Sequence, residues 1–453
     1  MKSERANNED VIKAHEINNL CRYMLCKKYC IFATNNMRKY VIIGLLMSLC
    51  FSLQAQRTKA DIHTVDIPTY AFMDYTHNAI QIPGKNPARL NRFFQKIDTL
   101  IEAGTGRINI LHIGGSHVQA DWFSHKVRQN LDIINGDFQT SRGLIFPFSV
   151  AKTNNPANYR VSYSGEWNAV RNVQKNREMP LGMSGIAVYT QDSLAQINIS
   201  LNPDENRRWE FTQLRLLGYV EDGSDCVRPV LYYNNDTIDG HFDLITKTYL
   251  FDLPEPDYEF SMGFIQMDTI PHTFVVQGFI PEKETPGIVY HAIGVNGASV
   301  PSYLNSENFE EELHLLKPDL IIFAIGINDA VSKDFTKESF CRNYNALIEK
   351  IERVNPDCAY IFITNNDSFR KVSRRKSQVN TNGLIAQSAF LSLAKEHQGG
   401  VWDLFSLMGG LRSIREWQAA GLAKSDKVHF TKEGYQLIGD MFYNALIDYY
   451  KAE

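Results

Sequence analysis

Apolar runs of strand length that end in glycine and alternate with helices characterise the C-terminal part of the chain. Residues 288–293 and 320–325 are such runs, and Gly294 and Gly326 follow them. Each helix between two such strands returns the chain to the same edge of a sheet, so the pattern predicts an α/β fold with a parallel sheet. Helices should cover both faces of that sheet. Further helices are expected near 309–316, 340–354, 386–397 and 431–449, and further strands near 360–364 and 401–404.

An earlier segment has the same character. Residues 87–102 carry apolar side chains at helical spacing, and 107–113 have the composition of a short buried strand. Gly114 and Gly115 end that strand, and residues 116–130 have the pattern of a helix. A strand, a tight glycine turn and a helix suit the same parallel sheet, so the two segments are predicted to form one α/β domain.

Short alternating runs separated by turn residues lie between the two α/β segments. Many short strands at this spacing indicate a β-sandwich, and we expect it to be an inserted domain. The predicted domains are a leader at 1–56, α/β segments at 57–145 and 287–453, and the insert at 146–286. The runs of the insert are 159–164, 186–190, 195–201, 211–219, 229–233, 246–251, 260–266 and 273–280.

The leader has the composition of a secretory signal peptide at residues 37–55. Met37 begins a short basic stretch, residues 40–51 are apolar, and small residues follow. The apolar run is short for a bilayer span, so we expect cleavage and a mature chain without a transmembrane span. The protein is therefore predicted to be exported, to the periplasm or beyond the cell. An uncut N-terminal anchor is the alternative.

The net charge and the cysteine content limit which binding partners and cofactors are expected for this chain. The formal net charge is −4, which does not favour binding to a nucleic-acid backbone. Downstream of the leader only Cys226, Cys341 and Cys358 remain, an odd number without the spacing of a metal site or a disulfide framework. No cofactor and no metal are predicted, and the three thiols are expected to be small buried side chains.

Four segments at predicted strand ends or loops carry the polar residues that are best suited to catalysis. Ser116 follows the first strand, and 296–299 follow the strand at 288–293. Residues 326–329 follow the strand at 320–325, and 425–429 precede the last helix. Because the carboxyl ends of parallel strands meet at one edge of a sheet, these segments are expected to converge.

The residue types in these segments suit acyl transfer. A serine hydroxyl needs a base to accept its proton, a histidine can be that base, and a carboxylate can orient the imidazole. Asp426 and His429 stand three residues apart, so one loop can present both toward Ser116. A glycine such as Gly297 lets a backbone N–H approach an oxyanion, and the Asn328 amide offers another donor. Each motif alone is also consistent with an ordinary turn or helix cap.

As an ordered set, the segments resemble the SGNH hydrolase superfamily. The matching motifs are Gly114-Gly115-Ser116, Gly297, Gly326-Ile327-Asn328-Asp329 and Asp426-Lys427-Val428-His429. The resemblance implies a flavodoxin-like three-layer fold with Ser116 as nucleophile, His429 as base and Asp426 as its orienting carboxylate. It also implies an oxyanion hole from the Ser116 and Gly297 N–H groups and the Asn328 side chain. In this chain Gly115 replaces the aspartate that usually precedes the serine.

A narrower resemblance is to peptidoglycan O-acetylesterases. In those enzymes a histidine follows the serine, as His117 does here, and a sandwich resembling a carbohydrate-binding module separates the first two motifs. This resemblance implies a secreted serine esterase that removes O-acetyl groups from a glycan, with peptidoglycan as a candidate. A glycan-binding protein without activity and a polysaccharide O-acetyltransferase on the same fold are the alternatives.

Several further residues have two interpretations. His117 and Asp329 are candidate substrate-binding residues, although a local structural role suits both. Asp121 is expected to be a solvated helix position, and the basic run from Lys371 to Lys376 a solvated loop or helix end. Five aromatic residues of the insert could stack on sugars, but core packing is expected for most of them: Trp167, Tyr189, Trp209, Tyr232 and Tyr233.

Overall fold

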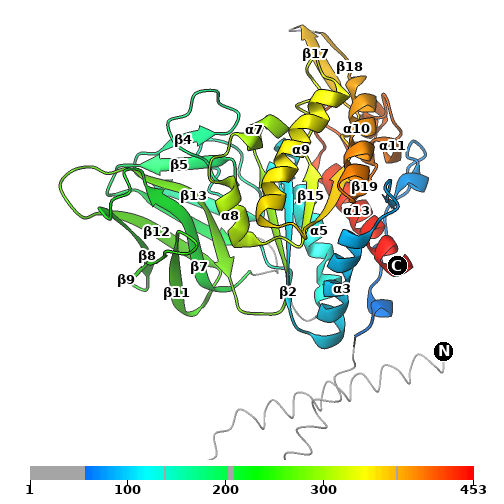
Figure 1. Cartoon of the computed structure of the whole chain (residues 1–453). Coiled ribbons are helices and arrows are strands. Elements are labelled where there is room, and N and C mark those ends of the chain that lie inside the picture. Colours follow the sequence, from blue (N-terminus) through cyan, green and yellow to red (C-terminus); the bar gives the residue numbers. More distant parts are fainter. Residues whose placement is uncertain (1–56, 137–138, 202–208, 374–375) are drawn as a thin grey trace, which may run out of the picture. The chain divides into compact units, whose positions relative to one another are not determined.

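The computed structural model describes residues 57–136, 139–201, 209–373 and 376–453 (Figure 1). The predicted signal peptide at 37–55 lies outside the described residues. Within the described ranges, no helix has both the length and the apolar character that a membrane span requires.

A six-stranded sheet with the order β1-β19-β16-β15-β2-β14 forms the centre of the α/β part. Five of its strands are parallel, as predicted, but the two-residue strand β1 pairs antiparallel with β19 at the edge. The parallel strands, numbered along the chain, have the order 2-1-3-4-5, which is flavodoxin-like. The bounds are β1 Ile80–Gln81, β2 Arg107–Gly114, β14 Gly287–Gly294, β15 Leu320–Ala324, β16 Ala359–Ile363 and β19 Gly400–Trp402.

Successive side chains of each central strand point to two different hydrophobic cores. In β15, Ile321 and Phe323 join the core beneath α7, α8, α9 and α10, whereas Leu320 and Ile322 join the core beneath α3, α5 and α13. The sheet is therefore the middle of three layers, as the alternation of strands and helices predicts. The bounds are α3 Ala88–Ala103, α5 Trp122–Asn130, α7 Val300–Leu304, α8 Phe309–Leu316, α9 Lys337–Val354, α10 Asn382–Glu396 and α13 Lys432–Ala452.

Two antiparallel sheets lie between the α/β segments and pack face to face. One has the order β10-β11-β7-β13-β5-β4, and the other β3-β6-β12-β8-β9. Aromatic rings join the two inner faces, with centroids 4.9 Å apart for Phe264 and Phe274 and 5.0 Å apart for Phe260 and Phe279. The bounds are β3 Tyr159–Ser164, β4 Asn168–Arg171, β5 Ile186–Thr190, β6 Gln196–Leu201, β7 Phe211–Val220, β8 Val227–Tyr233, β9 Asp236–Asp239, β10 His241–Asp243, β11 Thr248–Asp257, β12 Glu259–Gln266 and β13 Phe274–Glu282.

The core beneath α7 to α10 continues into this sandwich without a break. It includes Ile113 and Phe323 of the central sheet together with Phe211 and Phe279 of the sandwich. The Tyr159 hydroxyl also donates to the Phe146 carbonyl at 2.6 Å, which joins the sandwich to the preceding segment. Because the two parts share this core, packing does not mark a boundary between them, and the domain boundaries at 145/146 and 286/287 remain predictions.

Two expectations about local structure are wrong. The helix expected at 116–130 is divided into α4, Ser116–Gln119, and α5, because Asp121 has a left-handed backbone with φ 51°. The basic run near Lys371 is exposed, as expected, but its described residues belong to a two-stranded hairpin and not to a loop or helix end; the strands are β17 (Phe369–Ser373) and β18 (Lys376–Val379), at the top of Figure 1. The short remaining helices are α6 Asp132–Asn135, α11 Leu404–Leu407 and α12 Ile414–Ala419, with 3-10 turns η1 Lys59–Asp61 and η2 Tyr75–His77.

Candidate active site

The carboxyl ends of three neighbouring strands bring the polar segments together. Gly114 of β2 lies in register with Gly294 of β14 on one side and Ala324 of β15 on the other. The segments that follow these strands carry Ser116, Gly297 and Asn328, so all three start from the same edge of the sheet, as the sequence predicts.

Ser116, His429 and Asp426 form a continuous hydrogen-bonded chain. The Ser116 Oγ lies 2.7 Å from His429 Nε2, and His429 Nδ1 lies 2.8 Å from Asp426 Oδ2. The other oxygen of Asp426 accepts the backbone N–H groups of Val428 at 2.9 Å and His429 at 3.0 Å. Burial raises the pKa of Asp426, but these hydrogen bonds outweigh it, so the pKa lies below its usual value and the carboxyl is ionised at neutral pH.

The loop that presents His429 is fixed at its C-terminal end. Phe430 is buried and packs its ring against Trp417 and Tyr435, at centroid distances of 5.2 and 5.5 Å. The next residue, Thr431, caps α13 by accepting the Gly434 N–H at 3.2 Å. His429 therefore stands directly before a buried anchor and a capped helix, which limits the movement of its ring.

Glycine is required where the nucleophile turn leaves β2. A Cβ on Gly114 would lie 2.2 Å from Val118 Cγ2, and one on Gly294 would lie 2.5 Å from the Gln119 backbone nitrogen. These contacts are too close for any other residue without a backbone shift, so both glycines allow α4 to pack against the strand ends. Tyr303 of α7 supports the turn by donating its hydroxyl to the Gly114 carbonyl at 2.8 Å.

Three predicted oxyanion donors lie around this turn. Ser116 is the first residue of α4, where backbone N–H groups have no partner within the helix. Gly297 has φ 84°, a conformation that favours glycine, and in the described part of the chain no acceptor is found for its N–H. The Asn328 amide donates one hydrogen to the Ala298 carbonyl at 2.8 Å, which leaves its second hydrogen for a ligand.

Gly115 has no side chain, and this leaves space for the neighbouring Asn328 amide. A Cβ on Gly115 would lie 3.3 Å from Asn328 Nδ2 and 3.4 Å from the Ala298 carbonyl oxygen. The glycine that replaces the usual aspartate therefore leaves the serine and histidine contacts intact and borders one of the predicted donors.

Asp329 and His117, the two candidate substrate-binding residues, both contact neighbouring elements. Asp329 accepts the Val300 N–H at 3.2 Å, which ties the loop after β15 to the start of α7. Burial raises the pKa of Asp329 to about 6. The His117 Nδ1 lies 2.7 Å from the Tyr435 hydroxyl, and burial, helped by the nearby His429, lowers the pKa of His117 to about 3. A neutral His117 does not oppose a positive charge on His429, whose ring centroid is 5.2 Å away.

Gln119 is a residue of this site that the sequence did not single out. Its Oε1 accepts the Asn296 N–H at 2.7 Å, and its Nε2 lies within hydrogen-bond distance of Thr153 and Asn154. The side chain thus joins α4, the loop before the sandwich and the loop that carries Gly297. In the sequence, a glutamine one helical turn after the candidate nucleophile was the available hint, but its hydrogen-bond partners lie far from it along the chain.

Asp121 is buried, and the expectation of a solvated helix position is wrong. Its carboxylate accepts from Arg142 at 2.6 Å, from Asn158 at 2.8 Å and from Arg128 at 3.4 Å, and the three charged side chains are at most 2% exposed. Burial opposes ionisation, but the two guanidinium groups hold the pKa of Asp121 well below its usual value. This charge cluster fixes the join between α4 and α5 directly behind the nucleophile turn.

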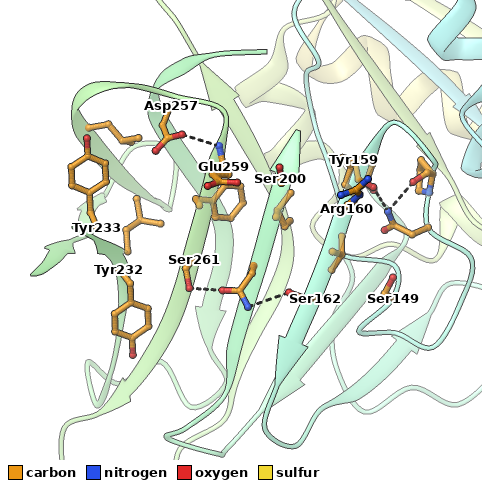
Figure 2. Close-up of a pocket in the computed structure, with 18 of the residues that line it drawn as sticks. Ser149, Tyr159, Arg160, Ser162, Ser200, Tyr232, Tyr233, Asp257, Glu259 and Ser261 are labelled. Carbon is orange, nitrogen blue, oxygen red and sulfur yellow. Dashed lines mark hydrogen bonds between the residues drawn. The ribbon is translucent and has the colours of Figure 1, made fainter. Parts of the chain in front are cut away.

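A groove lies on the sandwich, and neither Ser116 nor His429 lines it. It has a volume of about 890 Å³ and lies over the outer face of the sheet β3-β6-β12-β8-β9 (Figure 2). Ser162, Asn198, Ser261 and Tyr232 form one row across four paired strands. Trp167 and Trp209 of the insert are buried, as expected for core residues, whereas the Tyr232 ring is 40% exposed.

Comparisons with known proteins found one family model and several solved structures to which this chain is similar. Residues 277–437 match the GDSL-like lipase/acylhydrolase family. A solved structure of a peptidoglycan O-acetylesterase matches with a TM-score of 0.64 at 19% identity, over 83% of this chain and 99% of that one. An acetyl xylan esterase matches with a TM-score of 0.29 at 17% identity, over 35% of this chain and 81% of its own. A lipase/acylhydrolase from Enterococcus faecalis matches with a TM-score of 0.28 at 21% identity, over 36% and 77%. A search of curated proteins found no match.

Proposed function

We propose that this chain is a carboxylic ester hydrolase of the SGNH superfamily and that Ser116, His429 and Asp426 are its catalytic triad. The match of residues 277–437 to the GDSL-like lipase/acylhydrolase family supports the proposal. The observation that carries this proposal is the chain of two contacts, 2.7 Å from Ser116 Oγ to His429 Nε2 and 2.8 Å from His429 Nδ1 to Asp426 Oδ2. Both distances are short enough for proton transfer and for orientation of the imidazole.

The proposed reaction proceeds through an acyl-enzyme. His429 Nε2 accepts the hydroxyl proton as Ser116 Oγ attacks the ester carbonyl, and the Asp426 carboxylate stabilises the resulting imidazolium. The Ser116 and Gly297 N–H groups and the Asn328 amide stabilise the oxyanion. His429 then protonates the leaving alcohol, and water, activated by the same imidazole, releases the acid and restores the serine.

We propose that the substrate is an O-acetylated carbohydrate, with peptidoglycan as the leading candidate. The fold of the peptidoglycan O-acetylesterase extends over most of this chain, which supports this class of substrate. The groove of the sandwich adds independent support, since saccharides bind through hydroxyl and amide groups together with aromatic faces. Ser261 Oγ donates to Asn198 Oδ1 at 2.5 Å, and Asn198 in turn donates to Ser162, so the row is pre-ordered beside the exposed Tyr232 ring (Figure 2).

Export through the signal peptide at 37–55 belongs to the same proposal, because a cell-wall glycan lies outside the cytoplasm. The composition of the leader supports it.

An acetate-release assay tests the proposed function. Mature protein is incubated in parallel with O-acetylated peptidoglycan and acetylated xylan, and the expected result is faster release of acetate from peptidoglycan. Faster release from xylan would replace the proposed glycan and keep the esterase. Transfer of acetyl groups to a glycan acceptor that outpaces release would identify an acetyltransferase. Binding of polysaccharide without release of acetate would leave only the glycan-binding function.

A further inference from the structure

A cysteine, a histidine and an aspartate converge at two connected turns of the sandwich. Cys226 precedes β8, whereas Asp268 and His272 lie in the turn between β12 and β13. One ligand atom from each of the three residues lies within 4.8 Å of the other two. The His272 Nε2 and Asp268 Oδ2 atoms are 3.2 Å apart, so two of the three already touch.

Hydrogen bonds hold the backbone around Cys226, Asp268 and His272 in place. The Met267 N–H donates to the Cys226 carbonyl at 2.8 Å, which extends the pairing of β8 with β12 up to the thiol. The Gln266 side chain holds both backbone groups of His272, with Oε1 accepting its N–H at 3.0 Å and Nε2 donating to its carbonyl at 2.9 Å. The Asp268 carboxylate accepts the Ile270 N–H at 2.9 Å. The ligand residues are therefore held before any ion binds.

A fourth residue orients the imidazole. Asp222 Oδ2 lies 2.6 Å from His272 Nδ1, which leaves Nε2 directed to Asp268 and Cys226. In protein metal sites a carboxylate commonly binds the far nitrogen of a ligating histidine, where it fixes the tautomer and increases the basicity of the ring. Asp222 has the position that this arrangement requires.

The donor set and its size suit a zinc-like ion. Thiolate sulfur, imidazole nitrogen and carboxylate oxygen are the ligands of Zn²⁺, at roughly 2.3, 2.0 and 2.0 Å from the metal. Tetrahedral ligands at such bond lengths stand roughly 3.3–3.8 Å apart. The ligand atoms of the three residues all lie within 4.8 Å of one another, so binding an ion would need side-chain movements of at most about 1.5 Å. Cys226 is partly buried and the His272 side chain is 14% exposed, so a fourth ligand position is open to water.

A simple ion pair is the competing explanation for His272. Hydrogen bonds that the ring donates to the Asp222 and Asp268 carboxylates raise the pKa of His272, which favours an imidazolium between the two acids when no metal is bound. In this metal-free arrangement the Cys226 thiol takes part only as a hydrogen-bond donor to the Asp268 carboxylate, whose pKa it helps to lower. A divalent cation at Nε2 would replace the proton and engage all three side chains.

We propose that Cys226, Asp268 and His272 bind one divalent transition-metal ion of the zinc class, with Asp222 orienting His272. The bound ion would connect the β7–β8 and β12–β13 turns and stabilise this end of the sandwich. The proposal does not depend on the esterase function, because none of the four residues belongs to the triad or the oxyanion donors.

Titration with Co²⁺ tests the proposal, because thiolate ligation gives Co²⁺ a charge-transfer absorption that ligation by oxygen and nitrogen alone does not. The mature protein is first stripped with a chelator and kept reduced. We expect this absorption to reach a plateau at one equivalent of Co²⁺ and to disappear on addition of Zn²⁺. Cys226→Ser should abolish the band, while Cys341→Ser, which changes a thiol outside the cluster, should retain it. Asp222→Asn should weaken the affinity about 10- to 100-fold.

Thermal unfolding supplies the second readout. Zn²⁺ should raise the Tm of the wild-type protein and of Ser116→Ala, but not that of Cys226→Ser, if that variant unfolds cooperatively. If Cys226→Ser does not fold, His272→Ala replaces it, with the same expected loss of the Tm increase. A folded wild-type protein without the charge-transfer band, or a band that survives Cys226→Ser, would overturn the proposal.

Discussion

Replacing Asp426 by asparagine should disable the proposed base while leaving the loop folded. The amide oxygen of Asp426→Asn can keep both backbone N–H groups that the carboxylate now accepts, those of Val428 and His429. The amide NH₂ then faces His429 Nδ1 in place of an acceptor oxygen. The ring is forced into the tautomer with hydrogen on Nε2, and this nitrogen can no longer accept the Ser116 proton.

The size of the effect follows from the hydrogen bonds involved. Returning the ring to the reactive tautomer breaks the new hydrogen bond, about 1.5 kcal/mol, and leaves two donors facing each other, about 1–3 kcal/mol. At about 1.36 kcal/mol per tenfold in rate, this predicts a fall in kcat of roughly 10²–10³-fold. Buried triads lose about 10⁴-fold on the same change, but the Asp426 and His429 side chains are 47% and 33% exposed, and water reduces the loss.

The assay is the initial rate of hydrolysis of a chromogenic acetyl ester, from which kcat and KM are obtained. Asp334→Asn, which makes the same change at an exposed position, is the matched control and should retain wild-type kcat. Circular dichroism during thermal unfolding verifies that both variants fold. A folded Asp426→Asn variant with a kcat within about tenfold of the wild type would refute the tautomer argument.

Three further changes test other parts of the structure. Asp121→Ala removes the carboxylate from two buried guanidinium groups, so urea unfolding should show a loss of about 3–5 kcal/mol, and a loss below about 1 kcal/mol would contradict the buried cluster. Gly115→Ala places a Cβ 3.3 Å from Asn328 Nδ2, and a shift of this donor should lower kcat about tenfold at similar KM, whereas an unchanged kcat would show that the added methyl group does not displace the amide. Burial raises the pKa of Glu312 from 4.5 to about 8, so the stability present below pH 4.5 is lost as the pH rises through about 8. Glu312→Gln keeps an acceptor for the Met183 N–H, now 2.6 Å away, and should raise the Tm at pH 9 but not at pH 4; equal effects at both pH values would contradict this assignment.

The sequence predicted those features whose signal is local. The strand expected at 288–293 is β14, the helix expected at 309–316 has the bounds of α8, and the helix expected near 431–449 is α13, with Thr431 as its cap. Apolar periodicity, glycine punctuation and a capping residue are each contained within a few residues. The approach of His429 to Ser116 was implied by the resemblance of Asp426-Lys427-Val428-His429 to the last motif of the SGNH superfamily.

Features that depend on distant contacts were not predictable. Asp121 has a left-handed backbone because Arg142 and Asn158, which belong to other segments, hold its carboxylate. Strand β1 is only two residues long and forms because β19 offers an open edge. The approach of Cys226 to His272 depends on the register between β8 and β12, which no spacing in the sequence reveals.

Turnover by Ser116→Ala is the most direct measurement of the proposed mechanism. The variant is compared with the wild type and with Ser332→Ala, an exposed serine in another loop, by acetate release from the same ester at neutral pH. A hydroxyl that attacks the ester predicts a fall of about 10³-fold or more in kcat for Ser116→Ala and no loss for Ser332→Ala. A folded Ser116→Ala variant that keeps wild-type turnover would contradict the assignment of this serine as the nucleophile.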